Sequence, residues 1–168
     1  MSNTIPRELA SRIVWFCTRL NVQAGETVIE KGSPGDELFI ITRGQFRVHD
    51  DSAGEDFVLA MLNRGDIFGE MTFIDRTERS ASVTAVGAGS ILRMGSAEYG
   101  AMLDKDPKTA VEFMRFLSSI VCRRLRMAND ALLQVAYGDQ GLDTSEDSTL
   151  KRAIANMHEA VRMELEGT

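Results

Sequence analysis

Short apolar segments separated by glycine are the feature that most narrows the fold of this chain. Between residues 21 and 95 the sequence carries strand-length segments with turn residues between them, namely 27–30, 37–42, 45–49, 56–62, 82–86 and 90–94. Short strands at regular spacing, joined by glycine turns, are typical of an all-β barrel or sandwich. Helix-like segments lie on both sides. The expected class is therefore α+β: an antiparallel β-roll (a jelly roll, or double-stranded β-helix) flanked by helices.

The N-terminal flank is expected to be a helix over residues 6–20. Pro6 suits a first helical position, and an apolar residue recurs at helical spacing at Leu9, Ile13, Phe16 and Leu20. After the roll, Asp106 can cap a helix that Pro107 begins. This helix is long, at about 108–137, and we assign residues 1–137 to one domain.

The long helix carries apolar positions that alternate three and four residues apart. This heptad stripe consists of Val111, Met114, Ser118, Val121, Leu125, Ala128, Leu132 and Val135. Such a repeat is typical of paired helices. It predicts a homodimer, although part of the stripe could pack on the roll instead. Residues 138–147 are polar and acidic and are expected to be a linker. Residues 148–168 form an amphipathic pattern, which predicts a last helix. This helix either folds back on its own domain or on the dimer partner, or it serves as a switch helix or a partner-docking helix.

The run from Phe68 to Val83 contains the residues with the clearest chemistry. Gly69 can open a short helical turn, whose first N–H groups attract an anion. Arg79, nine residues after Glu70, can grip phosphate oxygens with two parallel hydrogen bonds. A carboxylate repels phosphate, so Glu70 should face another group, such as a sugar hydroxyl. The run therefore predicts a phosphate site with a second polar contact.

The same run resembles the phosphate-binding cassette of the cyclic nucleotide-binding domain family. The family pattern is Phe-Gly-Glu, an apolar and a small residue, a loop, then Arg, two small residues, Ser or Thr, and Val. Two further stretches resemble the family, from Gly35 to Gly44 and from Gly65 to Glu70, and the likeness covers roughly residues 9–135. It implies a non-enzymatic sensor that binds cAMP or cGMP. The implied ligand-binding residues are Phe68, Gly69, Glu70, Met71, Thr72, Arg79, Ser80, Ala81, Arg124 and Asn129.

The resemblance assigns the ribose 2′-hydroxyl to Glu70 and the phosphate to Arg79. Thr72 stands where the family has Ala, Gly or Ser, and Glu78 stands where kinase-type members have Pro. In bacterial members the long helix is the dimer helix, and a pair of hydroxyl residues after Arg-Arg-Leu contacts the base. Here Arg123, Arg124 and Leu125 form that motif, and Ala128 and Asn129 stand at the positions of the hydroxyl pair. The choice between cAMP and cGMP therefore stays open.

Composition limits the other functions. A net charge of −6 and a pI of about 5.0 predict no nucleic-acid partner. No segment reaches the ~18 apolar residues of a membrane span, and no leader is recognisable, so a cytoplasmic protein is expected. Cys17 and Cys122 are then expected to be reduced, buried thiols in helices. The sequence shows no metal-ligand spacing and no set of catalytic groups, so neither a metal nor an enzyme is expected.

Three alternatives stand beside the sensor, and one of them is a regulatory fragment of a kinase, channel or other effector. A member of this family that regulates transcription needs a DNA-binding domain after the long helix, but only 31 residues follow Tyr137. We therefore expect a stand-alone, bacterial-looking member that signals to an unknown protein partner. The third alternative is a degenerate fold of this family that serves as a protein-interaction module and binds no nucleotide.

Overall fold

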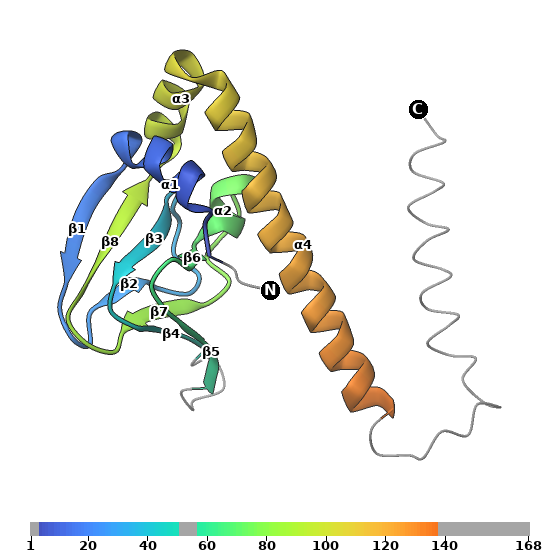
Figure 1. Ribbon diagram of the computed structural model, residues 1–168. Coiled ribbons are helices and arrows are strands. Elements are labelled where there is room, and N and C mark those ends of the chain that lie inside the picture. Colours follow the sequence, from blue (N-terminus) through green and yellow to red (C-terminus); the bar gives the residue numbers. More distant parts are fainter. Residues whose placement is uncertain (1–3, 51–56, 138–168) are drawn as a thin grey trace, which may run out of the picture. The chain divides into compact units, whose positions relative to one another are not determined.

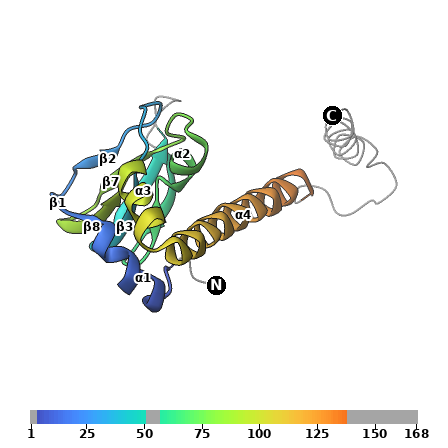
Figure 2. The ribbon, with the colours of Figure 1, turned by 90° about the horizontal axis from the view of Figure 1, so that it is seen from above.

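The computed structural model describes residues 4–50 and 57–137 of the 168-residue chain, with side chains up to residue 133 (Figures 1 and 2). The chain divides into two compact units, Met1–Leu125 and Arg126–Thr168, and each is considered by itself. The predicted linker at 138–147 and the predicted helix at 148–168 lie outside the described residues. The domain limits drawn from the sequence stay a prediction.

Two four-stranded antiparallel sheets build the first unit (Figure 1). One sheet has the order β1 (Thr18–Val22), β8 (Gly89–Met94), β3 (Leu38–Arg43) and β6 (Ile67–Phe68). The other has the order β2 (Thr27–Ile29), β7 (Ser82–Ala85), β4 (Phe46–Asp50) and β5 (Phe57–Leu62). The chain passes back and forth between the two sheets, which confirms the predicted antiparallel roll with flanking helices.

Two apolar cores meet at β3, whose residues Leu38–Ile41 are all buried. Successive side chains of a strand point to opposite faces. Phe39 and Ile41 accordingly belong to the core that includes Phe46 and Phe68 and lines the inside of the roll. Leu38 and Ile40 belong to the other core, which is closed by helices. β3 is therefore buried on both faces.

The N-terminal helix is shorter than the sequence predicts. The α-helix α1 spans Arg7–Ile13, a 3₁₀ turn covers Val14–Phe16, and the backbone becomes extended at Cys17. The prediction of helix through residue 20 is wrong, because Leu20 pairs with Ile91 of β8 as part of a strand. Strand pairing across the sheet thus overrides a local helical spacing. Cys17 is consequently not helical, and Cys122 is exposed rather than buried.

Two helices follow the roll, α3 (Ser96–Lys105) and the long α4 (Pro107–Tyr137). Asp106 caps α4 as predicted, since its carboxylate accepts hydrogen bonds from the backbone N–H and the hydroxyl of Thr109. The face of α4 that is buried against the roll consists of Ala110, Phe113, Leu117 and Ile120. These residues lie one position away from the predicted heptad stripe, which leaves most of that stripe outside the core.

Candidate functional site

The segment after β6 takes its shape from Gly69. Its φ of +77° lies in the left-handed region, and an added Cβ would meet the carbonyl oxygen of Glu37 at 2.9 Å. Glycine is therefore required here for both conformation and space. The short helix α2 (Glu70–Asp75) starts immediately afterwards and ends at Arg76, whose φ of 62° is also left-handed. The predicted helical turn after Gly69 is thus present.

Arg79 lies in the loop between α2 and β7 and is almost completely buried, with 5% of its side chain exposed. Its Nη1 donates to the carbonyl oxygens of Glu37 at 2.8 Å and of Gly69 at 3.2 Å. Its Nη2 donates to the Glu37 carboxylate at 3.2 Å. The guanidinium is therefore held in one orientation by the backbone on two sides and by one carboxylate.

Burial lowers the pKa of Arg79, and the carboxylates of Glu37, Asp36 and Glu70 oppose that shift. The ordinary pKa of arginine lies above ~12, so the side chain stays charged at neutral pH. Gly35 packs against the guanidinium, and an added Cβ there would come within 2.5 Å of Nη2. The site thus contains a buried, permanently charged group whose surroundings leave little room for other atoms.

Glu70 is the second buried charge, with 1% of its side chain exposed. Its carboxylate accepts a hydrogen bond from Nη1 of Arg124, on α4. Nη2 of Arg124 also donates to the carbonyl oxygen of Ile67 at 2.8 Å. Arg124 thus ties the long helix to the β6–α2 segment at two points. Any ligand that reaches Glu70 therefore meets a residue that is already in contact with α4.

One small cavity collects the predicted residues. Nine of the ten border it, together with Ile29, Val48 and Val83; those nine are Phe68, Gly69, Glu70, Met71, Thr72, Arg79, Ser80, Ala81 and Arg124. Thr72 is buried and its hydroxyl faces the carbonyl oxygen of Glu78, whereas Ser80 is exposed. The tenth residue, Asn129, is exposed and belongs to the second unit, so its relation to the cavity stays a prediction.

The cavity measures about 60 Å³, whereas pockets for small molecules usually hold ~300–1,000 Å³. Its wall must move to admit a nucleotide. Met71, which is exposed, and the partly exposed Arg124 are the wall residues best placed to move. The buried Glu70, Thr72 and Arg79 form the fixed part.

Glu37 is a partner of Arg79 that the sequence does not reveal. It lies at the start of a predicted strand, directly after a glycine-rich stretch, but nothing in that pattern pairs it with a residue more than forty positions later. The contribution of Gly35 was missed for the same reason, since only the folded chain brings this loop against the guanidinium. A buried arginine requires a counter-charge, and that general rule is the signal that could have prompted a search for one.

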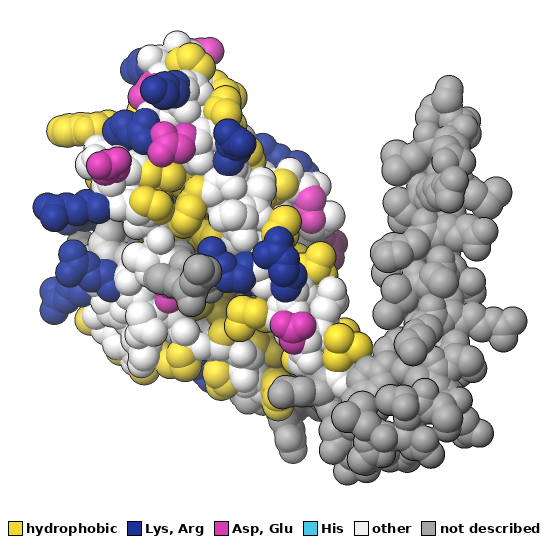
Figure 3. Space-filling model, turned by 45° about the vertical axis from the view of Figure 1, so that its right-hand side comes forward, with side chains coloured by type: hydrophobic (Ala, Val, Ile, Leu, Met, Phe, Trp, Pro, Cys, Tyr) yellow, Lys and Arg dark blue, Asp and Glu magenta, His cyan; other side chains and the backbone are white. Residues whose placement is uncertain are grey.

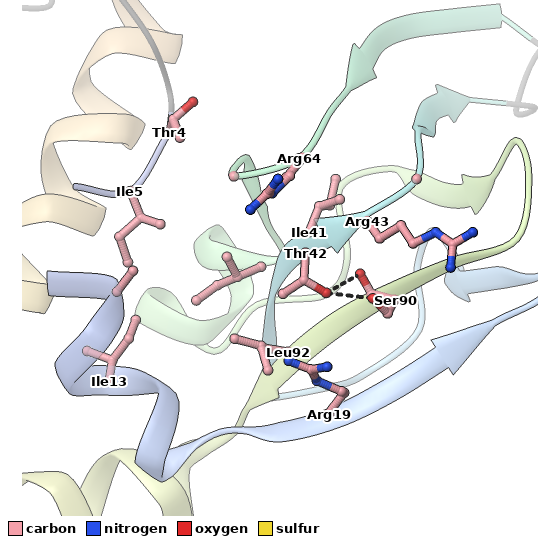
Figure 4. Close-up of a pocket in the computed structure, with 14 residues that line it drawn as sticks. Thr4, Ile5, Ile13, Arg19, Ile41, Thr42, Arg43, Arg64, Ser90 and Leu92 are labelled. Carbon is pink, nitrogen blue, oxygen red and sulfur yellow. Dashed lines mark hydrogen bonds between the residues drawn. The ribbon is translucent and has the colours of Figure 1, made fainter. Parts of the chain in front are cut away.

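A larger cavity, of about 750 Å³, lies elsewhere, between the N-terminal segment and the outer face of the β1–β8–β3–β6 sheet (Figure 4). Its wall combines apolar residues such as Ile5 and Leu92 with Arg19 and Arg64. Thr42 and Ser90 hydrogen-bond to each other on its floor. It shares no residue with the small cavity around Glu70 and Arg79, which we call the cassette cavity, and none of the ligand-binding residues singled out from the sequence lies in it.

Two further features are absent from the described residues. In that part of the chain, no three His, Cys, Asp or Glu side chains gather so as to hold a metal ion. No helix within the described ranges is long and apolar enough to cross a membrane.

Comparison with known proteins identifies the class. The family model of the cyclic nucleotide-binding domain matches residues 19–106, and the chain belongs to this family. A cyclic AMP receptor protein of Thermus thermophilus is 33% identical over 127 residues, which are 74% of this chain and 56% of the relative. The chain spans about half the length of the bacterial relatives it matches.

Solved structures agree. The catabolite activator protein of Thermus thermophilus superposes with a TM-score of 0.67 at 28% identity, covering 79% of this chain and 61% of the other. A second structure, presented under the name "A cyclic-GMP-dependent signalling pathway regulates bacterial phytopathogenesis", reaches a TM-score of 0.62 at 27% identity. It covers 75% of this chain and 96% of the other. The resemblance drawn from the cassette is confirmed, and so is the jelly-roll fold.

Proposed function

We propose that this chain is a non-enzymatic sensor that binds a 3′,5′-cyclic purine nucleotide in the cassette cavity. The observation that carries the proposal is that one cavity is lined by both a buried arginine, Arg79, and a buried carboxylate, Glu70. The cyclic phosphate would bind the Arg79 guanidinium, the Ser80 hydroxyl and the backbone N–H groups of Ser80 and Ala81. The ribose 2′-hydroxyl would donate to Glu70, which would discriminate against deoxynucleotides.

Signalling would run through Arg124. A ribose on Glu70 shares that carboxylate with the α4 arginine, so ligand binding and the position of the long helix are linked. A ligand shifts a conformational equilibrium only if it binds one state better than the other. The narrow cavity supplies that difference, because the nucleotide can enter only after part of the wall has moved.

The base is either adenine or guanine. One relative of this chain, from Thermus thermophilus, is named a cyclic AMP receptor protein. A solved structure similar to this chain is named for a cyclic-GMP-dependent signalling pathway. Asn129 has both a donor and an acceptor and is the predicted contact to the base edge, across a dimer. We favour cAMP, because two bacterial relatives, one from Thermus thermophilus and one from Mycobacterium tuberculosis, are named for cAMP.

A homodimer is part of this proposal. In the heptad stripe of α4, Val111, Leu125 and Leu132 are more than half exposed. Figure 3 shows hydrophobic side chains exposed among charged ones on the face drawn there. Burying apolar surface is favourable, and a second copy offers the same stripe. The downstream protein partner stays unidentified.

The second candidate is an interaction module that binds no nucleotide. It is favoured by the small volume of the cavity and by the fact that Arg79 and Glu70 each already have an internal partner of opposite charge. In this reading the two ion pairs are structural and hold the roll together.

Thermal unfolding in the presence of cAMP, cGMP and cyclic di-GMP separates the two candidates. A ligand at ~100 times its Kd adds about 2.7 kcal/mol to stability, which is several degrees for a chain of this size. The sensor is expected to be stabilised by cAMP or cGMP and not by cyclic di-GMP. No shift with either purine mononucleotide at millimolar concentration would favour the interaction module.

A further inference from the structure

The Glu37 carboxylate already accepts a hydrogen bond from the Arg79 guanidinium, which is the group that the proposed phosphate must bind. Arginine has five N–H donors. In Arg79 both hydrogens of Nη1 face carbonyl oxygens, and one hydrogen of Nη2 faces Glu37. Within the described part of the chain, Nε of Arg79 has no hydrogen-bond partner. The edge without a hydrogen-bond partner is therefore Nε with the remaining hydrogen of Nη2, and Gly35 lies beside this edge.

Phosphate on that edge would share Nη2 with Glu37. Two negative groups on one guanidinium repel each other, and the repulsion is strong where little water separates them. Arg79 is 5% exposed and the Glu37 side chain 30% exposed, so screening by solvent is incomplete. Glu37 thus lowers the affinity of Arg79 for any anion unless its carboxylate can move to another cation.

A second cation is present. The other oxygen of Glu37 lies 3.6 Å from Nη1 of Arg93, on β8. Nη2 of Arg93 donates at 2.9 Å to Glu98, whose second oxygen accepts from the backbone N–H of Gly95, directly before α3. Positive and negative side chains alternate in the order Arg79, Glu37, Arg93 and Glu98. Arg93 can therefore remain the ion-pair partner of Glu37 when Arg79 binds an anion.

We propose that Glu37 is an internal competitor of the ligand phosphate, and that Arg93 sets how easily Glu37 gives up Arg79. The inference rests on the proposed nucleotide site. It assigns to Glu37 and Arg93 a control of affinity that lies outside the cassette itself. In the bound state Glu37 pairs with Arg93 alone, so ligand binding also changes the ion pairs at the start of α3.

The sign of one substitution tests this. If Glu37 only positions Arg79, then Glu37→Gln weakens nucleotide binding. If Glu37 competes with phosphate, then Glu37→Gln tightens binding, by about tenfold for a charge removed at this range. The same variant lowers the unfolding temperature of the ligand-free protein, because Arg79 loses its counter-charge. Glu78→Gln is the matched control: it removes an exposed carboxylate next to Arg79 in sequence and should change affinity far less.

Arg93 provides the second arm. Arg93→Gln leaves Glu37 with Arg79 as its partner, so nucleotide binding should weaken. In the Glu37→Gln background the same change at Arg93 should have little effect, because residues acting through one another are not additive. Equal effects of Arg93→Gln in both backgrounds would show that Arg93 acts independently of Glu37. That result contradicts the proposal that Glu37 leaves Arg79 and pairs with Arg93 alone.

Isothermal titration of the full chain with cAMP and cGMP, for wild type and each variant, distinguishes the outcomes. Tighter binding by Glu37→Gln supports the inference, and does so even if wild type binds too weakly to measure. Unchanged or weaker binding by Glu37→Gln overturns the inference but leaves the sensor function intact. Absence of binding in wild type and in Glu37→Gln alike overturns both the inference and the proposed function.

Discussion

Replacement of Arg79 gives the sharpest test of the phosphate contact. In Arg79→Ala the bound phosphate loses its charged partner in a site where little water can compensate. Breaking a buried ion pair typically costs ~3–5 kcal/mol, so Kd should rise by a factor of at least ~100. Isothermal titration with the preferred nucleotide measures this factor directly.

The ligand-free protein should also suffer from this change. Arg79 donates to the carbonyl oxygens of Glu37 and Gly69, and each buried group left unpaired costs about 1–3 kcal/mol. The unfolding midpoint should therefore fall, by roughly 2–4 °C for each kcal/mol lost. Binding must be measured well below that midpoint, with circular dichroism to verify the fold.

Arg79→Lys is the matched variant, because it keeps the charge but not the planar fork. A single ammonium cannot reach both carbonyl oxygens and two phosphate oxygens. We expect an affinity between those of wild type and Arg79→Ala. A folded Arg79→Ala protein that binds the nucleotide with wild-type affinity would refute the assignment of the phosphate to Arg79.

Four further outcomes are expected. Glu70→Ala should cost less affinity than Arg79→Ala and should remove the preference for ribose over 2′-deoxyribose, which titration with the two forms of one nucleotide measures. Gly35→Ala would place a methyl group within 2.5 Å of Nη2 of Arg79 and should weaken binding, whereas Gly87→Ala has open space and should not. Leu125→Asp should convert a dimer into monomers in light scattering, and a monomeric wild type at high concentration would contradict the predicted dimer. Burial raises the pKa of Cys17 to about 12, so a thiol reagent at pH 8 should modify the exposed Cys122 rapidly and Cys17 only after unfolding; equal native rates would contradict this.

Much of the fold could be predicted because local signals and tertiary structure agree. The glycine-punctuated segments that the sequence predicts to be strands are strands in the structure. Gly69 illustrates the agreement: its left-handed φ and its close contact with Glu37 both demand glycine. Most of the cassette residues are close in sequence, so their meeting at one cavity follows from a short loop.

The predictions from the sequence are wrong where contacts between distant segments determine the structure. Residues 18–20 continue a helical spacing, yet they belong to a strand that pairs with β8. On α4 the stripe with the most regular heptads is largely outside the core, and a neighbouring face that includes Phe113 and Leu117 packs on the roll. Periodicity identifies amphipathic faces, but it cannot decide which face meets which surface when a helix carries two.

The charged residues of the site could be predicted from the sequence, but their ion-pair partners could not, for a similar reason. Arg79 and Glu70 were identified from the cassette pattern, and Arg124 from its place on the long helix. The pairs Arg79–Glu37 and Glu70–Arg124 join positions more than forty residues apart. No single-sequence pattern encodes such pairs, because each pair joins segments that only the folded chain brings together.

A crystal structure of the protein grown with its preferred nucleotide tests the central claim most directly. We expect the cyclic phosphate on Nε and Nη2 of Arg79 and the ribose 2′-hydroxyl on Glu70, in a cavity wider than the present 60 Å³. A nucleotide bound elsewhere, for example in the cavity between Arg19 and Arg64, would contradict this claim. So would crystals that contain no nucleotide at saturating concentration.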